Sequence, residues 1–370
     1  MIFIGEVGDR YVQQLAKDFN TLTGSENGVY RFCVENFPGG EYSVRLVDNP
    51  CNDPKRPASS YKNPVQLSRA IKKGEDVVLV VRGRYGSDWN SDRLMGIARQ
   101  ATEVLKSGDP EYLSGAVAKR LCLVMPHEPF TKQDKLFVDD GRQLRGAAKT
   151  LKMDRKDLKR DGVDLMLTVF PHDYRREGWV RKKAHKGHEQ IVYTDWTDVE
   201  QDGLCYVEDW KNFLWAIDPV HLVPEYIRRA GIKIDVAVSP DGNASSMCTA
   251  VRKDLGIWET GITKHRSRKD STQIRTTRRL DPTRIKGRSV GIFDDWVLRG
   301  TTMMHAIEDV RKAGAKAVHC FCVHGEFVGD AYERLKALGV KLYTTDTIDN
   351  PSAVISTTEQ IAERLNTLFD

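Results

Sequence analysis

The chain has 370 residues, of which 40% are hydrophobic and 29% are charged, and it carries a formal net charge of +5. This length predicts two domains, and the composition is sufficient for packed cores and excludes a largely disordered chain. The charge suits anionic small molecules but is too weak to indicate nucleic-acid binding by itself.

Short apolar runs predict buried strands in both halves of the chain. They are Val77–Val81, Leu121–Met125, Leu165–Phe170, Ile234–Val238, Ser289–Phe293 and Ala317–Val323. Between them, apolar residues at helical spacing predict helices over Arg93–Leu105, Met303–Ala313 and Ala331–Leu338. Strands that alternate with amphipathic helices indicate an α/β fold with mainly parallel sheets and helices on both faces.

The alternating pattern occurs twice, and two segments interrupt it. Residues 173–222 are rich in Trp, His and charged residues, and predict an insertion between the two sets or a flap over a site. Residues 263–288 are strongly basic and predict a long loop. We therefore expect one domain over residues 1–172 and a second over 223–370, whose last helix can pack on the first domain.

The most specific motif follows one of the predicted strands. The strand ends in the acidic pair Asp294 and Asp295, and a short loop with Gly300 leads into a helix that starts near Thr301 and Thr302. Free N–H groups at a helix N-terminus bind phosphate, and threonine hydroxyls add donors. The paired carboxylates suit sugar hydroxyls or the water ligands of a magnesium ion. An ordinary strand–turn–helix with a threonine cap accounts less well for two adjacent acids.

This acidic pair, loop and helix start resemble the ribose-phosphate-binding motif of type I phosphoribosyltransferases and of ribose-phosphate pyrophosphokinases. Further segments resemble the pyrophosphokinases, in the family's order and over most of the chain: Phe37–Glu41, Thr131–Lys135, Pro171–His172, Val238–Asn243, Thr263–Arg266, Lys286–Arg288, Val323–Gly325 and Thr344–Ile348. Each segment alone is weak evidence, whereas their shared order is strong. The resemblance implies two tandem type I phosphoribosyltransferase-like domains, each with a mainly parallel sheet flanked by helices.

The resemblance implies that the nucleotide is ATP and that two cations act on it. Lys264 and Arg266 would neutralise charge on the β-phosphate as the diphosphate is transferred. The implied ATP-binding residues are Phe37, Glu41, Lys132, Gln133, Asp134 and His172, the first two contacting adenine from a neighbouring subunit. The alternative for the two cations is a solvated basic loop, because residues 263–288 contain many other Lys and Arg residues.

On the acceptor side, the resemblance implies a ribose-phosphate site formed by Asp241, Asp294, Asp295, Arg299, Gly300, Thr301 and Thr302. The implied cofactor is Mg²⁺, with His172 and Asp241 as candidate ligands. The implied partners are ATP and an acceptor that contains ribose 5-phosphate, bound by a homo-oligomer (a dimer or a hexamer). Neither nucleic acid nor a membrane is expected as a partner.

Several residues depart from the family pattern and leave the acceptor open. Gly39 and Phe137 stand where the family has acids, and Lys132 stands where it has Arg, so the adenine contacts must differ. The phosphate loop has Leu298 and Arg299 where the family usually has Asp and Thr. The resulting Arg-Gly-Thr-Thr sequence is more similar to that of glutamine-dependent amidophosphoribosyltransferases.

Three classes of function are consistent with these residues. The first is a diphosphokinase that transfers the β,γ-diphosphate of ATP to the anomeric hydroxyl of ribose 5-phosphate, or of ADP-ribose, which some phage-encoded proteins similar to this family use to rebuild NAD. The second is a phosphoribosyltransferase, which the Arg-Gly-Thr-Thr loop favours and the nucleotide segments oppose. The third is an inactive regulatory homologue that binds nucleotides, supported by the lost acids.

The remaining features predict few further sites. Residues 1–10 lack the charged start and apolar run of a signal peptide, and no run of about 18 apolar residues occurs, so we expect a cytoplasmic protein. The seven cysteines contain no C-x-x-C pair and predict reduced thiols. His185 and His188 have metal-like spacing without a third ligand nearby, which indicates exposed histidines. Four tryptophans predict either an aromatic wall for a larger acceptor or a small satellite core: Trp179, Trp196, Trp210 and Trp215.

Overall fold

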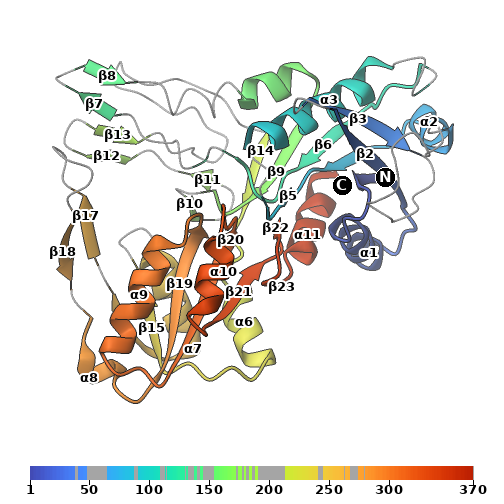
Figure 1. Ribbon diagram of the computed structural model, residues 1–370. Coiled ribbons are helices and arrows are strands. Elements are labelled where there is room, and N and C mark those ends of the chain that lie inside the picture. The colour runs from blue at the N-terminus through green and yellow to red at the C-terminus, as the bar shows by residue number, and fades with distance from the viewer. Residues whose placement is uncertain are drawn as a thin grey trace. The chain divides into compact units, whose positions relative to one another are not determined.

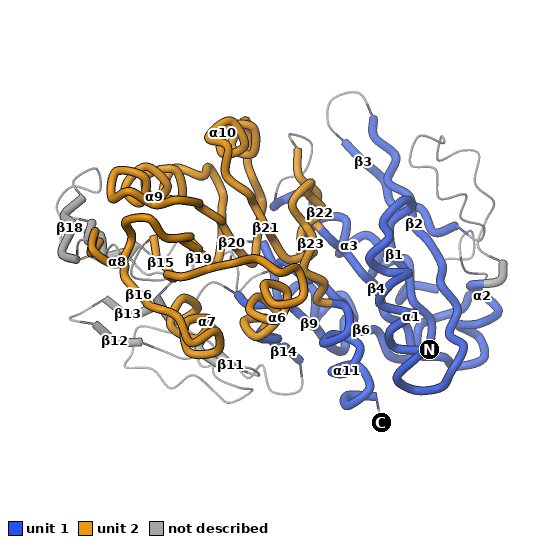
Figure 2. The backbone as a smooth tube through the Cα atoms, turned by 90° about the horizontal axis from the view of Figure 1, so that it is seen from below, with its two compact units in different colours: residues 1–82, 90–218, 358–370 blue, residues 83–89, 219–357 orange. Residues whose placement is uncertain are grey.

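The computed structural model describes residues 1–37, 41–47, 65–86, 91–108, 113, 115–129, 131, 137–139, 142–144, 154–171, 174–176, 179–180, 183–185, 188–190, 213–240, 245–261, 263–266, 274–278 and 280–369. Only the backbone is described in the parts of this set that fall within 65–66, 137–144, 174–190, 245–246 and 263–278. The chain divides into unit 1, residues 1–82, 90–218 and 358–370, and unit 2, residues 83–89 and 219–357 (Figure 2).

Unit 1 is built on a seven-stranded sheet with the strand order β14-β9-β6-β4-β1-β2-β3 (Figure 1). The strands are β1 (Ile2–Glu6), β2 (Gly28–Asn36), β3 (Tyr42–Val47), β4 (Val77–Val80), β6 (Leu121–Val124), β9 (Leu165–Val169) and β14 (Leu214–Ile217). Within this sheet the β2–β3 pair is antiparallel and the other pairs are parallel. Every residue of β4 and β6 is buried, as expected for parallel strands that helices cover on both faces.

The helices of unit 1 are α1 (Tyr11–Thr23), α2 (Val65–Lys72), α3 (Ser91–Ser107), a helix over 154–160, and α11 (Thr358–Phe369). Helices α1 and α11 pack on each other (Figure 1). Phe19 of α1 contacts Phe3 of β1 with ring centroids 5.6 Å apart, and Thr358 donates to the Asp18 carboxylate at 2.6 Å. The connection from β1 through α1 leads to β2, towards one edge of the sheet, and the connection from β4 through α3 leads to β6, towards the other edge. Because both crossovers are right-handed, α1 and α3 lie on opposite faces of the sheet.

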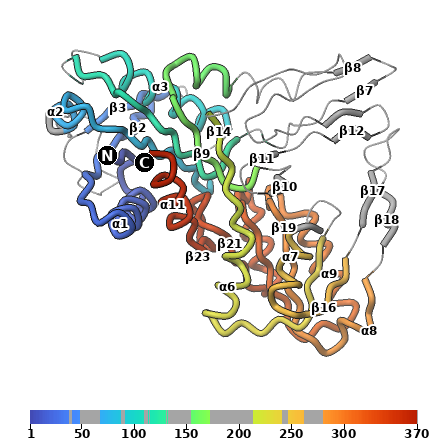
Figure 3. The backbone as a smooth tube through the Cα atoms, turned by 180° about the vertical axis from the view of Figure 1, so that it is seen from behind, coloured from blue at the N-terminus to red at the C-terminus, as the bar shows by residue number. Residues whose placement is uncertain are grey.

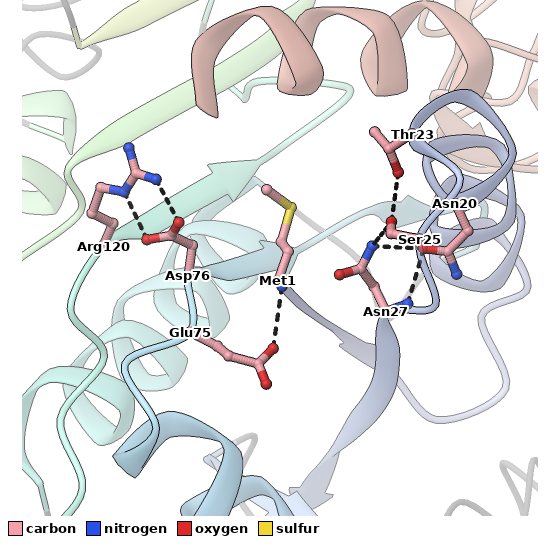
Figure 4. Close-up of polar contacts among 8 residues, drawn as sticks. All are labelled: Met1, Asn20, Thr23, Ser25, Asn27, Glu75, Asp76 and Arg120. Atoms are coloured by element: carbon pink, nitrogen blue, oxygen red, sulfur yellow. Dashed lines mark hydrogen bonds and ion pairs between the residues drawn. The ribbon is translucent and has the colours of Figure 1, made fainter. Parts of the chain in front are cut away.

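Polar pairs close the amino end of the first sheet (Figure 4). The ammonium group of Met1 lies 3.1 Å from the carboxylate of Glu75. Arg120 donates from Nε to Asp76 at 2.6 Å and from Nη2 to the second oxygen of the same carboxylate at 2.5 Å. Each of these four charges therefore has a partner of opposite sign.

Unit 2 is built on a six-stranded parallel sheet with the order β16-β15-β19-β20-β21-β23. The strands are β15 (Val236–Ser239), β16 (Trp258–Gly261), β19 (Ser289–Val297), β20 (Ala317–Gly325), β21 (Lys341–Thr345) and β23 (Ala353–Ile355). Helices α9 (Thr301–Lys312) and α10 (Ala331–Ala337) cover one face, and α6 (Leu222–Arg229) and α7 (Ser245–Leu255) the other (Figures 1 and 3). The predicted α/β fold with parallel sheets flanked by helices is confirmed.

The basic segment 263–288 contains regular structure, so its prediction as a long loop is wrong. Strands β17 (Thr263–Arg266) and β18 (Ile274–Arg278) form an antiparallel pair, and α8 (Pro282–Ile285) follows. The composition is misleading here because β-branched Thr and Ile residues lie among the cations, and such residues favour strands. Similar two-stranded ribbons join β7 (Phe137–Asp139) to β8 (Arg142–Leu144), β10 (Tyr174–Arg176) to β11 (Trp179–Val180), and β12 (Lys183–His185) to β13 (His188–Gln190).

The compact units differ from the expected boundaries at residues 172 and 223. Strand β14, from the segment expected as an insertion, pairs with β9 at the edge of the first sheet. Strand β5 (Gly83–Arg84) belongs to unit 2, where it pairs with β22 (Ile348–Asp349), whereas α11 belongs to unit 1, in line with the packing expected of the last helix. A domain boundary drawn from the order of strands cannot detect such exchanges, because they depend on which surfaces bury each other.

The described cysteines are buried: Cys33, Cys122, Cys248, Cys320 and Cys322. Burial raises the pKa of the Cys33 thiol to about 11, so this thiol is protonated at neutral pH. Over the ranges given above, the helices are too short or too polar to cross a bilayer.

Candidate active site

The candidate site of unit 2 lies where the order of its strands reverses. The chain passes from β15 through α7 to β16 in one direction, and from β19 through α9 to β20 in the other. In open α/β sheets, ligands bind at such a switch point, outside the carboxyl ends of the strands. The loop 298–300 follows β19 at this point, and Asp241, which follows β15, lies outside the described residues.

Gly300 shapes the turn from β19 into α9. Its φ is +71°, in the left-handed region, where a side chain is strained. A Cβ added to Gly300 would lie 3.1 Å from Leu335 Cδ1, so the position is also closely packed. Helix α9 has no side-chain cap and no acid in its first turn, which keeps the positive end of its dipole uncompensated by side chains.

The carbonyl groups of this turn are bonded to the segment that follows β20. The bonds are Glu326 N and Phe327 N to Val297 O, each 3.1 Å, Val328 N to Leu298 O at 2.8 Å, and Arg334 Nη2 to Arg299 O at 2.9 Å. The Gly300 carbonyl accepts from Met304 N at 2.8 Å. In contrast, no acceptor among the described residues bonds the N–H groups of Arg299 to Met303. The turn therefore offers consecutive donors to an anion while its acceptors are already occupied.

The acidic pair precedes this turn. Strand β19 continues to Val297 because β20 offers ladder partners as far as Gly325, so the pair lies within the strand and not at its end as predicted. Asp294 and Asp295 are 5% and 7% exposed, and the backbone N–H of Asp295 donates to the Asp294 carboxylate at 3.0 Å. Burial and then the neighbouring Asp294 carboxylate raise the pKa of the Cys322 thiol, so Cys322 stays protonated beside the pair.

A second polar group lies at the carboxyl end of β20. His324 is 2% exposed, and its Nδ1 lies 3.0 Å from the hydroxyl of Thr347. Thr345 and Thr347 both donate to the Val323 carbonyl, at 2.7 and 3.3 Å. These bonds bring together the two C-terminal segments that resemble the pyrophosphokinases, and they stiffen the edge of the sheet beside β19.

Trp296, next to the acidic pair, connects it to this edge. Its Nε1 donates to the Glu326 carboxylate at 2.9 Å. Its ring packs edge-on against the His324 ring, with the ring centroids 5.5 Å apart. Neither Trp296, Glu326 nor Arg334 was predicted as a site residue. The Arg334 bond joins residues 35 positions apart, so no local sequence signal identifies it.

The structure describes the predicted residues of the nucleotide side only in part. Phe37 N–H donates to the Glu41 carbonyl at 2.8 Å, which brings both residues to the β2–β3 turn of unit 1. The Phe37 side chain is 44% exposed, as required for stacking on a base. Lys264 and Arg266 lie on β17, where the backbone alone is described. Four predicted ATP residues lie outside the described residues: Lys132, Gln133, Asp134 and His172.

The predicted magnesium ligands His172 and Asp241 also lie outside the described residues. Within those that are described, no cluster of three or more metal-binding side chains occurs. The buried carboxylates of Asp294 and Asp295 have the oxygen donors that Mg²⁺ prefers, so their chemistry fits a hydrated magnesium ion or sugar hydroxyls.

Comparisons with known proteins find similar sequences. The phosphoribosyl transferase domain family model matches residues 207–361. The ribose-phosphate pyrophosphokinase of Methanosarcina acetivorans is 33% identical over 153 residues, which cover 41% of this chain and 53% of that protein, so the chain spans about half the length of this relative. The enzyme of the same name from Corynebacterium glutamicum is 25% identical over 319 residues, 83% of this chain and 81% of that one.

A solved structure is similar over the whole chain. The phosphoribosylpyrophosphate synthetase of Mycobacterium smegmatis matches with a TM-score of 0.61 and 19% identity, covering 100% of this chain and 98% of that one. At this identity the likeness concerns the fold, and it agrees with the predicted pair of phosphoribosyltransferase-like domains.

Proposed function

We propose that this chain is an ATP-dependent diphosphokinase, because residues 207–361 match the phosphoribosyl transferase domain model and the chain is similar in sequence to ribose-phosphate pyrophosphokinases. The anomeric hydroxyl of a ribose 5-phosphate group attacks the β-phosphorus of ATP. The bond from this phosphorus to the oxygen that bridges it to the α-phosphorus breaks, AMP leaves with that oxygen, and the hydroxyl releases its proton. The observation that carries the proposal is the row of N–H groups from Arg299 to Met303 that no acceptor among the described residues bonds, because such a row suits an acceptor phosphate.

Each part of the site has a role in this reaction. The N–H groups and the hydroxyls of Thr301 and Thr302 hold the 5-phosphate, and Asp294 and Asp295 hold the ribose hydroxyls. Bound Mg²⁺ would reduce the negative charge of the ATP phosphates, with Asp241 and His172 as its proposed ligands. Lys264 and Arg266 supply positive charge to the diphosphate as it transfers, while Phe37 and Glu41 bind adenine.

The direct test is release of AMP. Purified protein is incubated with ATP and magnesium in three reactions: one contains ribose 5-phosphate, one contains ADP-ribose and one contains no acceptor. The nucleotides are then separated by chromatography. We expect acceptor-dependent AMP in equal amount to the diphosphorylated product. Absence of AMP with both acceptors would contradict the proposal and favour a phosphoribosyltransferase or an inactive nucleotide-binding homologue.

Ribose 5-phosphate is the proposed acceptor, and Arg299 supports ADP-ribose as the alternative. Its side chain is exposed beside the anion-binding turn, while its carbonyl is held by Arg334. A long cation at this position can reach a second phosphate, which a threonine hydroxyl could not.

Changing both Leu298→Asp and Arg299→Thr is therefore expected to shift the preference towards ribose 5-phosphate if ADP-ribose is the native acceptor. The measurement is the ratio of kcat/KM for the two acceptors. If the native protein already prefers ribose 5-phosphate and the double variant keeps that ratio, Arg299 does not select the acceptor.

Arg334 is expected to position the anion-binding turn. Arg334→Met removes the bond to the Arg299 carbonyl, and we expect the KM for the acceptor to rise about tenfold, as for one lost charge-assisted hydrogen bond, while the KM for ATP stays unchanged. Arg311→Met is the matched control, because Arg311 also donates to a backbone carbonyl, that of Leu338, away from the turn. Equal effects of both substitutions on the acceptor KM would show a general loss of stability instead.

The subunit arrangement follows from the same proposal. If Phe37 and Glu41 bind the nucleotide of a neighbouring subunit, activity requires a homo-oligomer, a dimer or a hexamer. Mass measurement in solution tests this expectation.

A further inference from the structure

The β2–β3 turn of unit 1 is attached to helix α3. Asn36 and Tyr42 are the last ladder pair before this turn, and the Phe37 N–H donates to the Glu41 carbonyl within it at 2.8 Å. Strand β3 is the last strand in the order of its sheet, and α3 packs on it (Figure 1). The contacts between α3 and the last ladder pair therefore affect where the turn carries the exposed Phe37 ring.

Arg93, in the first turn of α3, contacts both members of this pair. Its guanidinium carbon lies 4.9 Å from the centroid of the Tyr42 ring, and its Nη2 donates to the side-chain oxygen of Asn36. The Tyr42 hydroxyl donates to the Arg93 carbonyl at 3.4 Å. Burial raises the pKa of this hydroxyl, and Arg93 partly opposes the effect. Because 3.4 Å is long for such a bond, the packing of the ring contributes more than the hydroxyl.

Gly96 provides the space that the Tyr42 side chain occupies. Its backbone is not left-handed, so its conformation does not require glycine. Glycine inside a helix is less favourable than alanine. A Cβ added to Gly96 would overlap the Tyr42 hydroxyl oxygen and would lie 3.0 Å from Cζ of the same ring. The close approach of Tyr42 to the helix therefore accounts for a glycine at this position.

The next turn of α3 is bonded to the same strand. The Val44 N–H donates to the side-chain oxygen of Gln100 at 3.1 Å. Gly96 and Gln100 are four residues apart, so they lie on one side of the helix. Strand β3 is thus fastened to α3 at two points that are one helical turn apart.

We propose that Tyr42, packed at Gly96 and against Arg93, is a positioning residue that sets the β2–β3 turn for the nucleotide base. This inference rests on the proposed function, in which Phe37 and Glu41 bind adenine. A turn that is already held in place loses less conformational freedom when the base binds, so its attachment to α3 favours nucleotide affinity. Tyr42 acts through the turn and does not itself contact the nucleotide.

The test is the binding of an ATP analogue to Gly96→Ala. The analogue has a methylene group between the α- and β-phosphorus atoms, so it cannot transfer its diphosphate, and its Kd is measured by calorimetry with magnesium present. The added Cβ displaces the Tyr42 ring and with it the turn. We expect the Kd of the analogue to rise about tenfold, as for one lost aromatic contact, while the Kd of ribose 5-phosphate stays unchanged.

A second background shows whether the effect passes through Tyr42. Leucine at position 42 ends before the ring atoms that a Cβ at Gly96 would meet. Tyr42→Leu is expected to weaken analogue binding by itself, and Gly96→Ala should then cause no further loss. Gly96→Ala should lower Tm in the native background, because it overpacks the contact. In the Tyr42→Leu background it should raise Tm by about 2–4 °C, because alanine favours the helix.

Gly28→Ala is the matched control. A Cβ there would also meet a tyrosine ring, at 3.0 Å from Cε2 of Tyr30, but Gly28 begins β2 at the end of the strand away from the turn. This variant should bind the analogue as the native protein does.

Two results would overturn the positioning role. One is an unchanged Kd of the analogue in Gly96→Ala. The other is an equal effect of Gly96→Ala, on Kd or on Tm, in the native and Tyr42→Leu backgrounds. If AMP is released from ATP but Gly96→Ala binds the analogue normally, the reaction stands and the positioning role fails. Weaker analogue binding by Gly96→Ala, relieved in the Tyr42→Leu background, in a protein that releases no AMP would give the reverse. Absence of analogue binding by the native protein contradicts both.

Discussion

Alanine at Lys264 or at Arg266 is expected to lower kcat by about 10²-fold or more, with little change in the KM for either substrate. The reason is that both cations are proposed to meet the diphosphate when its charge is redistributed in the transition state, so their loss affects the reaction more than the binding. Initial rates of AMP release at varied ATP and varied acceptor separate the two effects.

The ribbon itself provides the control for this experiment. Arg275 on β18 lies opposite His265 on β17, so Arg275→Ala removes a cation from the same ribbon between the two proposed catalytic positions. We expect Arg275→Ala to retain most of the activity. Comparable losses in all three variants would mean that the general positive charge of the ribbon matters and that no single cation is catalytic.

Alanine at Gly300 is expected to reduce kcat/KM for the acceptor by about tenfold or more, because a left-handed residue with a Cβ costs about 1–2 kcal/mol and the added atom meets Leu335 at 3.1 Å. Relief of the backbone strain is expected to rotate the N–H groups of the turn away from the anion. The KM for ATP should not change, since ATP is proposed to bind other residues.

Gly339→Ala is the matched control for the backbone effect. Gly339 in unit 2 has φ +65°, close to the +71° of Gly300, but a Cβ there meets no heavy atom within 4 Å. Both variants should lose stability in thermal unfolding, Gly300→Ala somewhat more because its Cβ also meets Leu335, and only Gly300→Ala should lose acceptor binding. Unchanged acceptor kinetics in Gly300→Ala would exclude the turn as the phosphate site.

The local sequence around the acidic pair predicted some features of the structure and not others. Asp294, Asp295 and Gly300 lie within seven consecutive positions, and a strand, a tight turn and a helix start are each encoded by nearby residues. The anion-binding turn was therefore predictable. The length of β19 was not, because its last residues are strand only where β20 supplies partners as far as Gly325.

The basic segment around Lys264 shows the opposite case. Its charge favoured a loop, yet residues 263–266 and 274–278 pair as strands. Pairing between two short polar strands depends on register and on the surface beneath them, and neither is visible in the composition.

The sequence alone determined the alternation of strands and helices, the strand–turn–helix around Gly300 and the order of the segments that resemble the pyrophosphokinases. These features depend on neighbouring residues, whose spacing sets periodicity and backbone conformation. Only the tertiary structure decided that Arg334 holds the Arg299 carbonyl, that Thr358 meets Asp18 across 340 positions, and that Arg82 pairs with Asp9 across 73 positions. Such contacts join residues that are distant along the chain, and whether a charge is buried or paired depends on every element that packs around it.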